Sequence, residues 1–297
     1  KPFTGHIFEE SLLGNLIDSA LVLKNDNNIA INFNDNTPDE KACANLKKKF
    51  NKIDLAMLNY NAAGPYPSCF DNLSTEEKKE ENQRILKRNF DHLCNIIPIL
   101  KPRSVLPFAG SYILGGKNYI KNDYLGTTTW DVCSDYLSKN LNDEAKIICL
   151  REKDIFNLQS QESNKPYVKI DLEHMKKYIN EIKKFKYDYE DDIDPNFAVL
   201  KKDVLVAKNQ LAKRIKKFEI EVKSNVFLNL NNEQIKILNG IENNRKLICS
   251  MDNKLLRRIL DKKSHWNNAE IGAHISFIRE PNKMDPDVHT LMSFFHL

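Results

Sequence analysis

The sequence has few of the closely spaced residues by which metal and redox sites are usually recognised. Its six cysteines are scattered over 297 residues without a Cys-x-x-Cys pair, and its seven histidines form no His-x-His, His-x-x-His or His-Glu-x-x-His motif. Neither a zinc ribbon nor a cysteine-ligated iron–sulfur cluster is therefore indicated. Scattered cysteines in hydrophobic contexts are typical of a reducing compartment, so we expect a cytoplasmic protein.

Several common nucleotide-binding and hydrolase motifs are absent as well. Gly115-Gly116-Lys117 is not followed by Ser or Thr, so it is no phosphate-binding P-loop. The chain also contains neither the Gly-x-Gly-x-x-Gly fingerprint of dinucleotide-binding domains nor the Gly-x-Ser-x-Gly elbow of serine hydrolases.

Long apolar runs and a strong charge bias are both missing. No run approaches the roughly 20 apolar residues that a membrane span needs, and no signal peptide is visible. The chain has 45 basic and 41 acidic residues, interspersed along its length, for a net charge of +4. This balance is typical of a well-solvated surface and gives little support to a nucleic-acid partner. We therefore expect a small-molecule substrate, no nucleic acid and no membrane span.

Strand and helix patterns alternate in the first part of the chain. Apolar runs on both sides of a polar turn predict a hairpin over residues 18–34, and a helix is expected over 39–50. A buried strand follows at 53–59, then a helix from Ser74, and a short strand at 104–107. This order predicts an α/β layered domain.

The helix that begins at Ser74 has clear signals at both ends. Glu77, three residues after Ser74, completes a capping box. Pro98 and Pro102 are expected to end the helix.

The polar residues 157–166 are the best candidate for a domain boundary. We therefore expect one domain over 1–160 and an α+β extension over 167–297. Two charged helices, at about 171–187 and 196–223, open the extension. Strands and helices then alternate to the end of the chain.

Asp35 is the most specific candidate for a metal ligand. It directly follows a buried strand, and α/β sheets usually place their sites at the carboxyl ends of strands. A carboxylate there suits zinc, iron or manganese. An Asp that caps a turn is the alternative. His6 is the one histidine near this first predicted sheet, and it is the second candidate ligand.

Two further stretches are candidates for substrate binding. The first comprises Phe108, Gly110, Ser111 and Tyr112, where a glycine allows close backbone approach beside an aromatic pair. An ordinary strand-to-loop turn is the alternative. The second stretch begins with His265 and Trp266. Its aromatic and polar residues predict either a pocket or a rigid buried hydrogen-bond network.

Several stretches together resemble the later half of metallo-β-lactamase-fold proteins. They are 18–22 with 31–35, 52–55 with 62–67, and the helix from Ser74 that leads into 101–110. The likeness covers about residues 14–125. It is closest to the β-lactamase-like domain of CMP-N-acetylneuraminate hydroxylases and their bacterial relatives. The most specific part is Pro107-Phe108-Ala109-Gly110 followed by Tyr119-Ile120-Lys121.

This resemblance implies an αββα sandwich with a one- or two-metal site at one edge of its sheets. It implies that Asp35 is the metal-bridging carboxylate, with zinc or iron as the cofactor. The implied activity is metal-dependent hydrolysis of a small polar substrate, such as a sugar or nucleotide-sugar derivative, by metal-activated water.

The sequence departs from the family pattern in its histidines. The family's His-x-His-x-Asp-His motif lies upstream of the matched strands, and the chain begins at Lys1 without it. A histidine expected before Asp18 is replaced by Gly14-Asn15-Leu16, and another is missing near Lys117. We therefore expect a missing N-terminal segment or a partner chain to supply metal ligands.

Two alternatives to the hydrolase follow from these departures. One is a non-catalytic binding protein with a degenerate metal site. The other is an accessory subunit of a redox enzyme. The Rieske cluster of the hydroxylases has no counterpart here, so sialic-acid hydroxylation is not implied.

Overall fold

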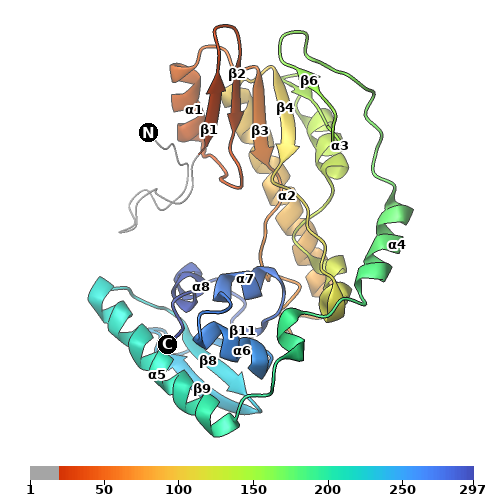
Figure 1. The fold of residues 1–297 in the computed structure, drawn as a ribbon. Coiled ribbons are helices and arrows are strands. Elements are labelled where there is room, and N and C mark those ends of the chain that lie inside the picture. Colours follow the sequence, from red (N-terminus) through yellow and green to blue (C-terminus); the bar gives the residue numbers. More distant parts are fainter. Residues whose placement is uncertain (1–19) are drawn as a thin grey trace. The chain divides into compact units, whose positions relative to one another are not determined.

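The computed structural model describes residues 20–297, which form two compact units (Figure 1). Within the described residues, unit 1 comprises 20–62, 83–112 and 126–175, and unit 2 comprises 63–82, 113–125 and 176–297. His6 lies outside the described residues. The mixed α/β class expected from the sequence is confirmed, since each unit combines helices with a sheet.

Unit 1 is built on a five-stranded sheet in the order β1-β2-β3-β4-β5. β1 (Leu21–Lys24) pairs antiparallel with β2 (Ile29–Asn32), which confirms the hairpin predicted over residues 18–34. β2, β3 (Leu55–Asn59), β4 (Ser104–Phe108) and β5 (Lys146–Ile147) are parallel neighbours. The carboxyl ends of β2, β3 and β4 therefore reach the same edge of the sheet.

Helices cover one face of this sheet. α1 (Glu40–Lys49), α2 (Thr75–Leu100) and α3 (Trp130–Asn140) connect the successive parallel strands (Figure 1). Their apolar sides share one core with the strand residues on that face. The buried members of this core from the strands are Ile31, Ala56, Leu58 and Val105, and those from the helices are Cys43, Leu46, Phe90, Leu93, Ile96, Ile97, Leu100, Cys133 and Leu137.

The opposite face carries a smaller apolar cluster. Ala30, Leu55 and Ile148 are buried there, and Phe156 packs against them. β6 (Phe156–Asn157) and β7 (Glu162–Ser163) form a hairpin in this region. The polar residues 157–166, which the sequence indicates as a boundary, thus belong to unit 1.

The polar side chain of Gln161 explains why this hairpin stays attached to unit 1. Gln161 is buried, and its Oε1 accepts a hydrogen bond from Ser104 Oγ in β4. Its Nε2 donates to the carbonyl of Leu158 at 2.7 Å. A buried amide of this kind needs such partners, because leaving it unpaired costs free energy.

The amino end of α2 confirms the predicted capping box. The amide of Glu77 donates to Ser74 Oγ at 3.2 Å, and the amide of Ser74 donates to Glu77 Oε2 at 2.7 Å. The prediction that Pro98 ends the helix is wrong, because α2 continues to Leu100. Pro98 lies in the last turn, where its ring removes a single backbone hydrogen bond. The helix ends at Leu100, two residues before Pro102, and the intervening Lys101 has a φ of +49°.

A buried carboxylate ties together the amino ends of three parallel strands. Asp54 is fully buried, and its Oδ2 accepts a hydrogen bond from the amide of Ile29 at 2.9 Å. Its Oδ1 lies 2.9 Å from Lys52 Nζ and 3.1 Å from Arg103 Nη1. Burial alone would raise the pKa of Asp54, but these hydrogen bonds and the Lys52 charge outweigh it and hold the pKa below its ordinary value.

Unit 2 contains a four-stranded sheet of mixed orientation in the order β11-β10-β8-β9. β10 (Lys246–Ser250) is parallel to β8 (Asn225–Leu230) and antiparallel to β11 (Ser276–Glu280). β8 and β9 (Glu233–Leu238) form a hairpin through Asn231 and Asn232, both of which have positive φ. The sequence analysis missed β9.

The helices of unit 2 include the two charged helices expected from the sequence. The second of them, α5 (Phe197–Phe218), buries an apolar stripe of Leu200, Val204, Ala207 and Leu211. The other helical segments are α4 (Leu172–Ile182), which spans the boundary between the units, η2 (Gly116–Tyr124), η3 (Asp188–Asp191), α6 (Asn253–Leu260), α7 (Trp266–Ile271) and α8 (Pro286–Met292). Among residues 20–297, none of the helices is both long and apolar enough to cross a membrane.

Candidate functional site

Polar side chains gather at the carboxyl edge of the unit 1 sheet. Asp35 follows β2, Asn59 ends β3, and Ser111 follows β4. Asn59 Nδ2 donates to the backbone carbonyl of Asp35 at 3.1 Å, so the loops after β2 and β3 are joined. Tyr60 Oη lies 3.1 Å from Ser111 Oγ and joins the loops after β3 and β4.

The hydrogen bonds around Ser111 have a definite direction. Ser111 Oγ lies 2.6 Å from the carbonyl of Thr128, which can only accept. Since a hydroxyl has one proton, Ser111 donates to Thr128, and Tyr60 must donate to Ser111. Asn61 holds the same backbone, because its Oδ1 accepts from the amide of Thr128 and its Nδ2 donates to the carbonyl, each at 2.9 Å.

A cavity of about 550 Å³ lies at this edge of unit 1. Three of the predicted substrate-binding residues, Phe108, Gly110 and Ser111, line it. The fourth, Tyr112, follows them and is half-buried, but it is not among the lining residues. A Cβ on Gly110 would lie 3.0 Å from Tyr60 Oη, so glycine permits the close approach of this turn to Tyr60.

The groups that line this cavity favour recognition over proton transfer. Burial raises the pKa of Tyr60 to about 12, so its hydroxyl stays protonated near neutral pH and keeps its hydrogen bond to Ser111. The proton of Ser111 is directed to a backbone carbonyl and not to a base, so this serine is not activated as a nucleophile. Arg151 and Glu152 contribute opposite charges to the wall.

Asp35 lies in an exposed turn beside this edge. Asn34 has a φ of +57°, and its amide donates to Asn32 Oδ1 at 2.7 Å, which makes a tight polar turn. The side chain of Asp35 is exposed, and Asp35 is not among the residues that line the cavity.

The described residues do not form a metal site around Asp35. Among residues 20–297, no group of three or more His, Cys, Asp or Glu side chains is placed to hold a metal ion. A zinc or iron site needs several such ligands, so Asp35 by itself does not fit the metal that the resemblance implies. The other predicted ligand, His6, lies outside the described residues.

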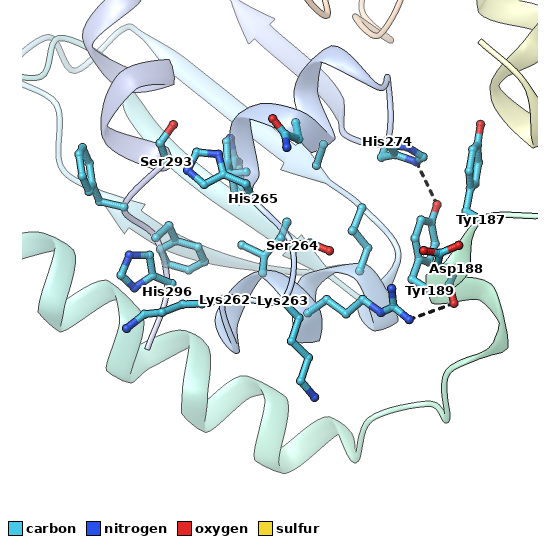
Figure 2. Close-up of a pocket in the computed structure, with 18 of the residues that line it drawn as sticks. Tyr187, Asp188, Tyr189, Lys262, Lys263, Ser264, His265, His274, Ser293 and His296 are labelled. Atoms are coloured by element: carbon cyan, nitrogen blue, oxygen red, sulfur yellow. Dashed lines mark hydrogen bonds between the residues drawn. The ribbon is translucent and has the colours of Figure 1, made fainter. Parts of the chain in front are cut away.

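His265 and Trp266 belong to unit 2 and line a different cavity, of about 820 Å³ (Figure 2). Trp266 is almost fully buried, and its Nε1 donates to Glu270 Oε1 at 2.7 Å. His289 Nδ1 lies 3.0 Å from the same oxygen. Trp266 thus takes part in a buried hydrogen-bond network and also forms a wall of a cavity, so both features predicted for this stretch are present.

The sequence analysis missed an aromatic cluster at the other end of this cavity. Tyr187 and Tyr189 stack on each other at 5.7 Å, and both contact the edge of the His274 ring (Figure 2). Burial, together with the positive charges of Lys121 and Lys117, lowers the pKa of His274 to about 4. His274 is therefore neutral at pH 7.

Two groups lie close to His274 Nδ1. Tyr189 Oη is 3.2 Å away, and Asn118 Nδ2, which also donates to the carbonyl of Gly272 at 3.2 Å, is 3.4 Å away. An amide nitrogen can only donate, so the contact with Asn118 favours Nδ1 as an acceptor. No sequence signal connects Tyr187 and Tyr189 to His274, because about 85 residues separate Tyr189 from His274 in the chain.

With the exception of Tyr112, which lines neither cavity, the predicted substrate-binding residues therefore divide between two cavities in two units. Comparison of the chain with models of known protein families finds no match, and comparison with curated proteins finds none either.

Proposed function

We propose that unit 1 binds a small polar molecule in the cavity at the carboxyl edge of its sheet, as the substrate-binding part of a metallo-β-lactamase-fold hydrolase. The observation that carries this proposal is the position of Phe108, Gly110 and Ser111, which line a cavity at the end of β4. Binding sites of open α/β sheets usually lie beyond the carboxyl ends of the strands.

The neutral hydroxyls and the backbone of this edge suit a sugar-like substrate. The hydroxyl oxygens of Tyr60 and Ser111, whose protons are donated within the protein, can accept hydrogen bonds from a ligand, and the turn at Gly110 brings the backbone close to Tyr60. Phe108 and Trp130 supply apolar surface to the same cavity. A cavity that is mostly apolar, with a few fixed polar groups, is typical of small-molecule sites.

The finer parts of this proposal rest on the sequence resemblance. They are the αββα sandwich and a zinc or iron site that includes Asp35. The described residues provide too few ligands for that metal. The hydrolase therefore requires His6, a segment preceding Lys1 or a partner chain to supply the imidazoles.

A second candidate function is a binding protein without catalysis. The exposure of Asp35 and the lack of a ligand group around it within residues 20–297 favour this candidate. It uses the same cavity and the same polar groups, and it differs only in the absence of a metal.

Metal analysis of the full-length protein separates the two candidates. For the hydrolase we expect at least one bound zinc or iron per chain and a clear loss of metal in Asp35→Asn. The matched control is Asp26→Asn, an exposed carboxylate in the β1–β2 turn. Less than about 0.2 equivalents of metal after purification contradicts the hydrolase, because metal catalysis needs a bound ion.

Blocking the cavity tests the binding proposal itself. Gly110→Val places a side chain against Tyr60, at a position that lines the cavity. Binding of N-acetylglucosamine and UDP-glucose, followed by NMR on the full chain, is expected to weaken by about tenfold or more, about 1.4 kcal/mol. Gly64→Val is the control, because a Cβ at Gly64 has no heavy atom within 4 Å. Neither sugar binding the wild-type chain, or equal binding by both variants, contradicts the proposal.

A further inference from the structure

The cavity of unit 2 combines an apolar wall with a polar end (Figure 2). The apolar wall includes Ile259 at the end of α6, Trp266 in α7, and Phe295 after α8. Trp266 and Phe295 are buried and meet edge to face, with 5.9 Å between their ring centroids. Rigid aromatic and aliphatic groups of this kind provide a surface for the apolar body of a ligand.

Four residues form the polar part, here called the cationic end: Lys262, His265, Ser293 and His296. In Figure 2, His265 lies next to Ser293, and Lys262 extends toward His296. Lys262 follows α6 with a φ of +61°. His265 occupies the N-cap position of α7, but its side chain makes no capping hydrogen bond.

The hydrogen bonds of His296 show that it lies beside a positive charge. Its Nε2 is 3.5 Å from Arg214 Nη1, and its Nδ1 is 3.1 Å from the carbonyl of Leu297. A guanidinium can only donate, so Nε2 accepts and the proton lies on Nδ1. Burial lowers the pKa of His296, and the charges of Arg214, Lys262 and His265 lower it further, against the hydrogen bond to Leu297.

Most other cations at this cavity are neutralised by carboxylates. Arg258 makes two hydrogen bonds to the carboxylate of Asp192, one through Nε and one through Nη2. Lys263 lies 3.9 Å from Asp261, and Lys186 lies 3.7 Å from Asp191.

Lys262 differs from these cations. Within residues 20–297 it forms no ion pair with a carboxylate, although it belongs to the cavity wall. Arg214, which contacts His296, donates to the carbonyl of Phe294 and lies over the Phe294 ring. Lys262 at the cationic end and Arg214 beside it therefore carry positive charge that no carboxylate side chain among residues 20–297 pairs with.

We propose that the unit 2 cavity binds a small organic anion, with its phosphate or carboxylate group at the cationic end and its apolar body against Trp266 and Ile259. Lys262 supplies a charge-assisted hydrogen bond, and Ser293 and His265 lie where they can donate further ones. This site lies in a different unit from the cavity of the proposed hydrolase and does not depend on that activity.

Binding of simple aromatic anions to the full chain tests the site. Phenyl phosphate and benzoate carry the two anionic groups on the same ring, whereas phenol and benzylamine carry a neutral and a cationic group. We expect phenyl phosphate or benzoate to bind in calorimetry and to shift the NMR signals of His265 and His296. Equal binding of all four compounds, or no binding of either anion at millimolar concentration, overturns the proposal.

A pair of neighbouring lysines supplies the matched variants. Lys262→Ala is expected to weaken anion binding about tenfold, the loss expected for one charge-assisted hydrogen bond. Both lysines are exposed, but Lys263 lies 3.9 Å from Asp261, so Lys263→Ala removes a charge that already has a carboxylate partner and is expected to change affinity less than about twofold. Equal effects of both variants, or none from Lys262→Ala in a chain with unchanged melting temperature, contradict direct contact.

Discussion

The two units hold their buried carboxylates in different ways. In unit 1, Lys52 and Arg103 are held against the buried carboxylate of Asp54, and the wall of the cavity contains hydroxyls, backbone and the oppositely charged side chains of Arg151 and Glu152. In unit 2, the buried carboxylate of Glu270 is held by the indole of Trp266 and the imidazole of His289. At the cavity of unit 2, Arg258, Lys263 and Lys186 lie against carboxylates of their own, whereas Lys262 has no such partner among the described residues.

This difference shows what each cavity can recognise. A cation that neutralises a structural carboxylate adds little to ligand binding, because its charge is already offset. This reasoning underlies our proposals of a neutral polar ligand for unit 1 and an anion for unit 2. The comparison depends on Asp54 and Glu270 being structural, which substitutions can test.

The largest effect is expected at Asp54. Asp54→Ala leaves the amide of Ile29 and two cations without their shared partner, and it should lower the free energy of unfolding by about 3–5 kcal/mol. Denaturant unfolding measures this loss. The control, Asp26→Ala in an exposed turn, should stay within about 0.5 kcal/mol. If Asp54→Ala lowers the free energy of unfolding by less than about 1 kcal/mol, the ion pairs of Lys52 and Arg103 with Asp54 do not stabilise the fold as we infer.

A smaller effect is expected at Glu270. Glu270→Ala removes the acceptor for Trp266 Nε1 and for His289, which should cost about 2 kcal/mol in the same measurement. Glu270→Gln keeps an acceptor oxygen and should cost less than about 1 kcal/mol, since no Lys or Arg faces this carboxylate in the contacts of the described residues. If Glu270→Gln is as destabilising as Glu270→Ala, the negative charge of Glu270 is needed for stability, as that of Asp54 is, and the contrast between the two units is wrong.

The smallest effect concerns the pH dependence of unit 2. The pKa of His274 is about 4 in the folded chain, whereas the pKa of an unperturbed histidine is about 6.5, so between these values the unfolded chain binds more protons. The free energy of unfolding should therefore fall as the pH drops from 6.5 toward 4. We expect His274→Gln to remove about 1 kcal/mol of this fall between pH 7 and 5, after allowance for solvent screening.

The matched control for this pH dependence is His174→Gln, on the exposed side of α4. This variant should keep the wild-type slope of unfolding free energy against pH. If His274→Gln and the wild-type chain have the same slope, the positive charges of Lys117 and Lys121 do not act on His274 as described.

Local signals in the sequence predicted individual elements well. The polar turn between apolar runs predicted the β1–β2 hairpin, and Ser74 with Glu77 predicted the start of α2. These signals work because turn preferences and helix caps depend on residues a few positions apart. The same local reasoning failed at Pro98, where a proline in a last turn costs less than one in a helix interior.

The candidate sites were predicted less completely. The sequence pointed to Phe108, Gly110 and Ser111, which do line a cavity, and to His265 and Trp266, which line another. It did not indicate Tyr60, whose hydroxyl reaches Ser111 across 51 positions of the chain. It also missed Lys262 and His296, because charged residues after a helix usually belong to the solvated surface.

By itself, the sequence determined the α/β class, the positions of most strands and helices, and the polar residues that follow the strands. Apolar periodicity and capping act over a few residues, so they can be read without knowledge of the fold. Only the tertiary structure decided which of those polar residues share a cavity. It also decided that Asp54 forms ion pairs with two cations, whereas Lys262 forms none with the described carboxylates. Burial and charge pairing depend on segments far apart in the chain, which no local pattern specifies.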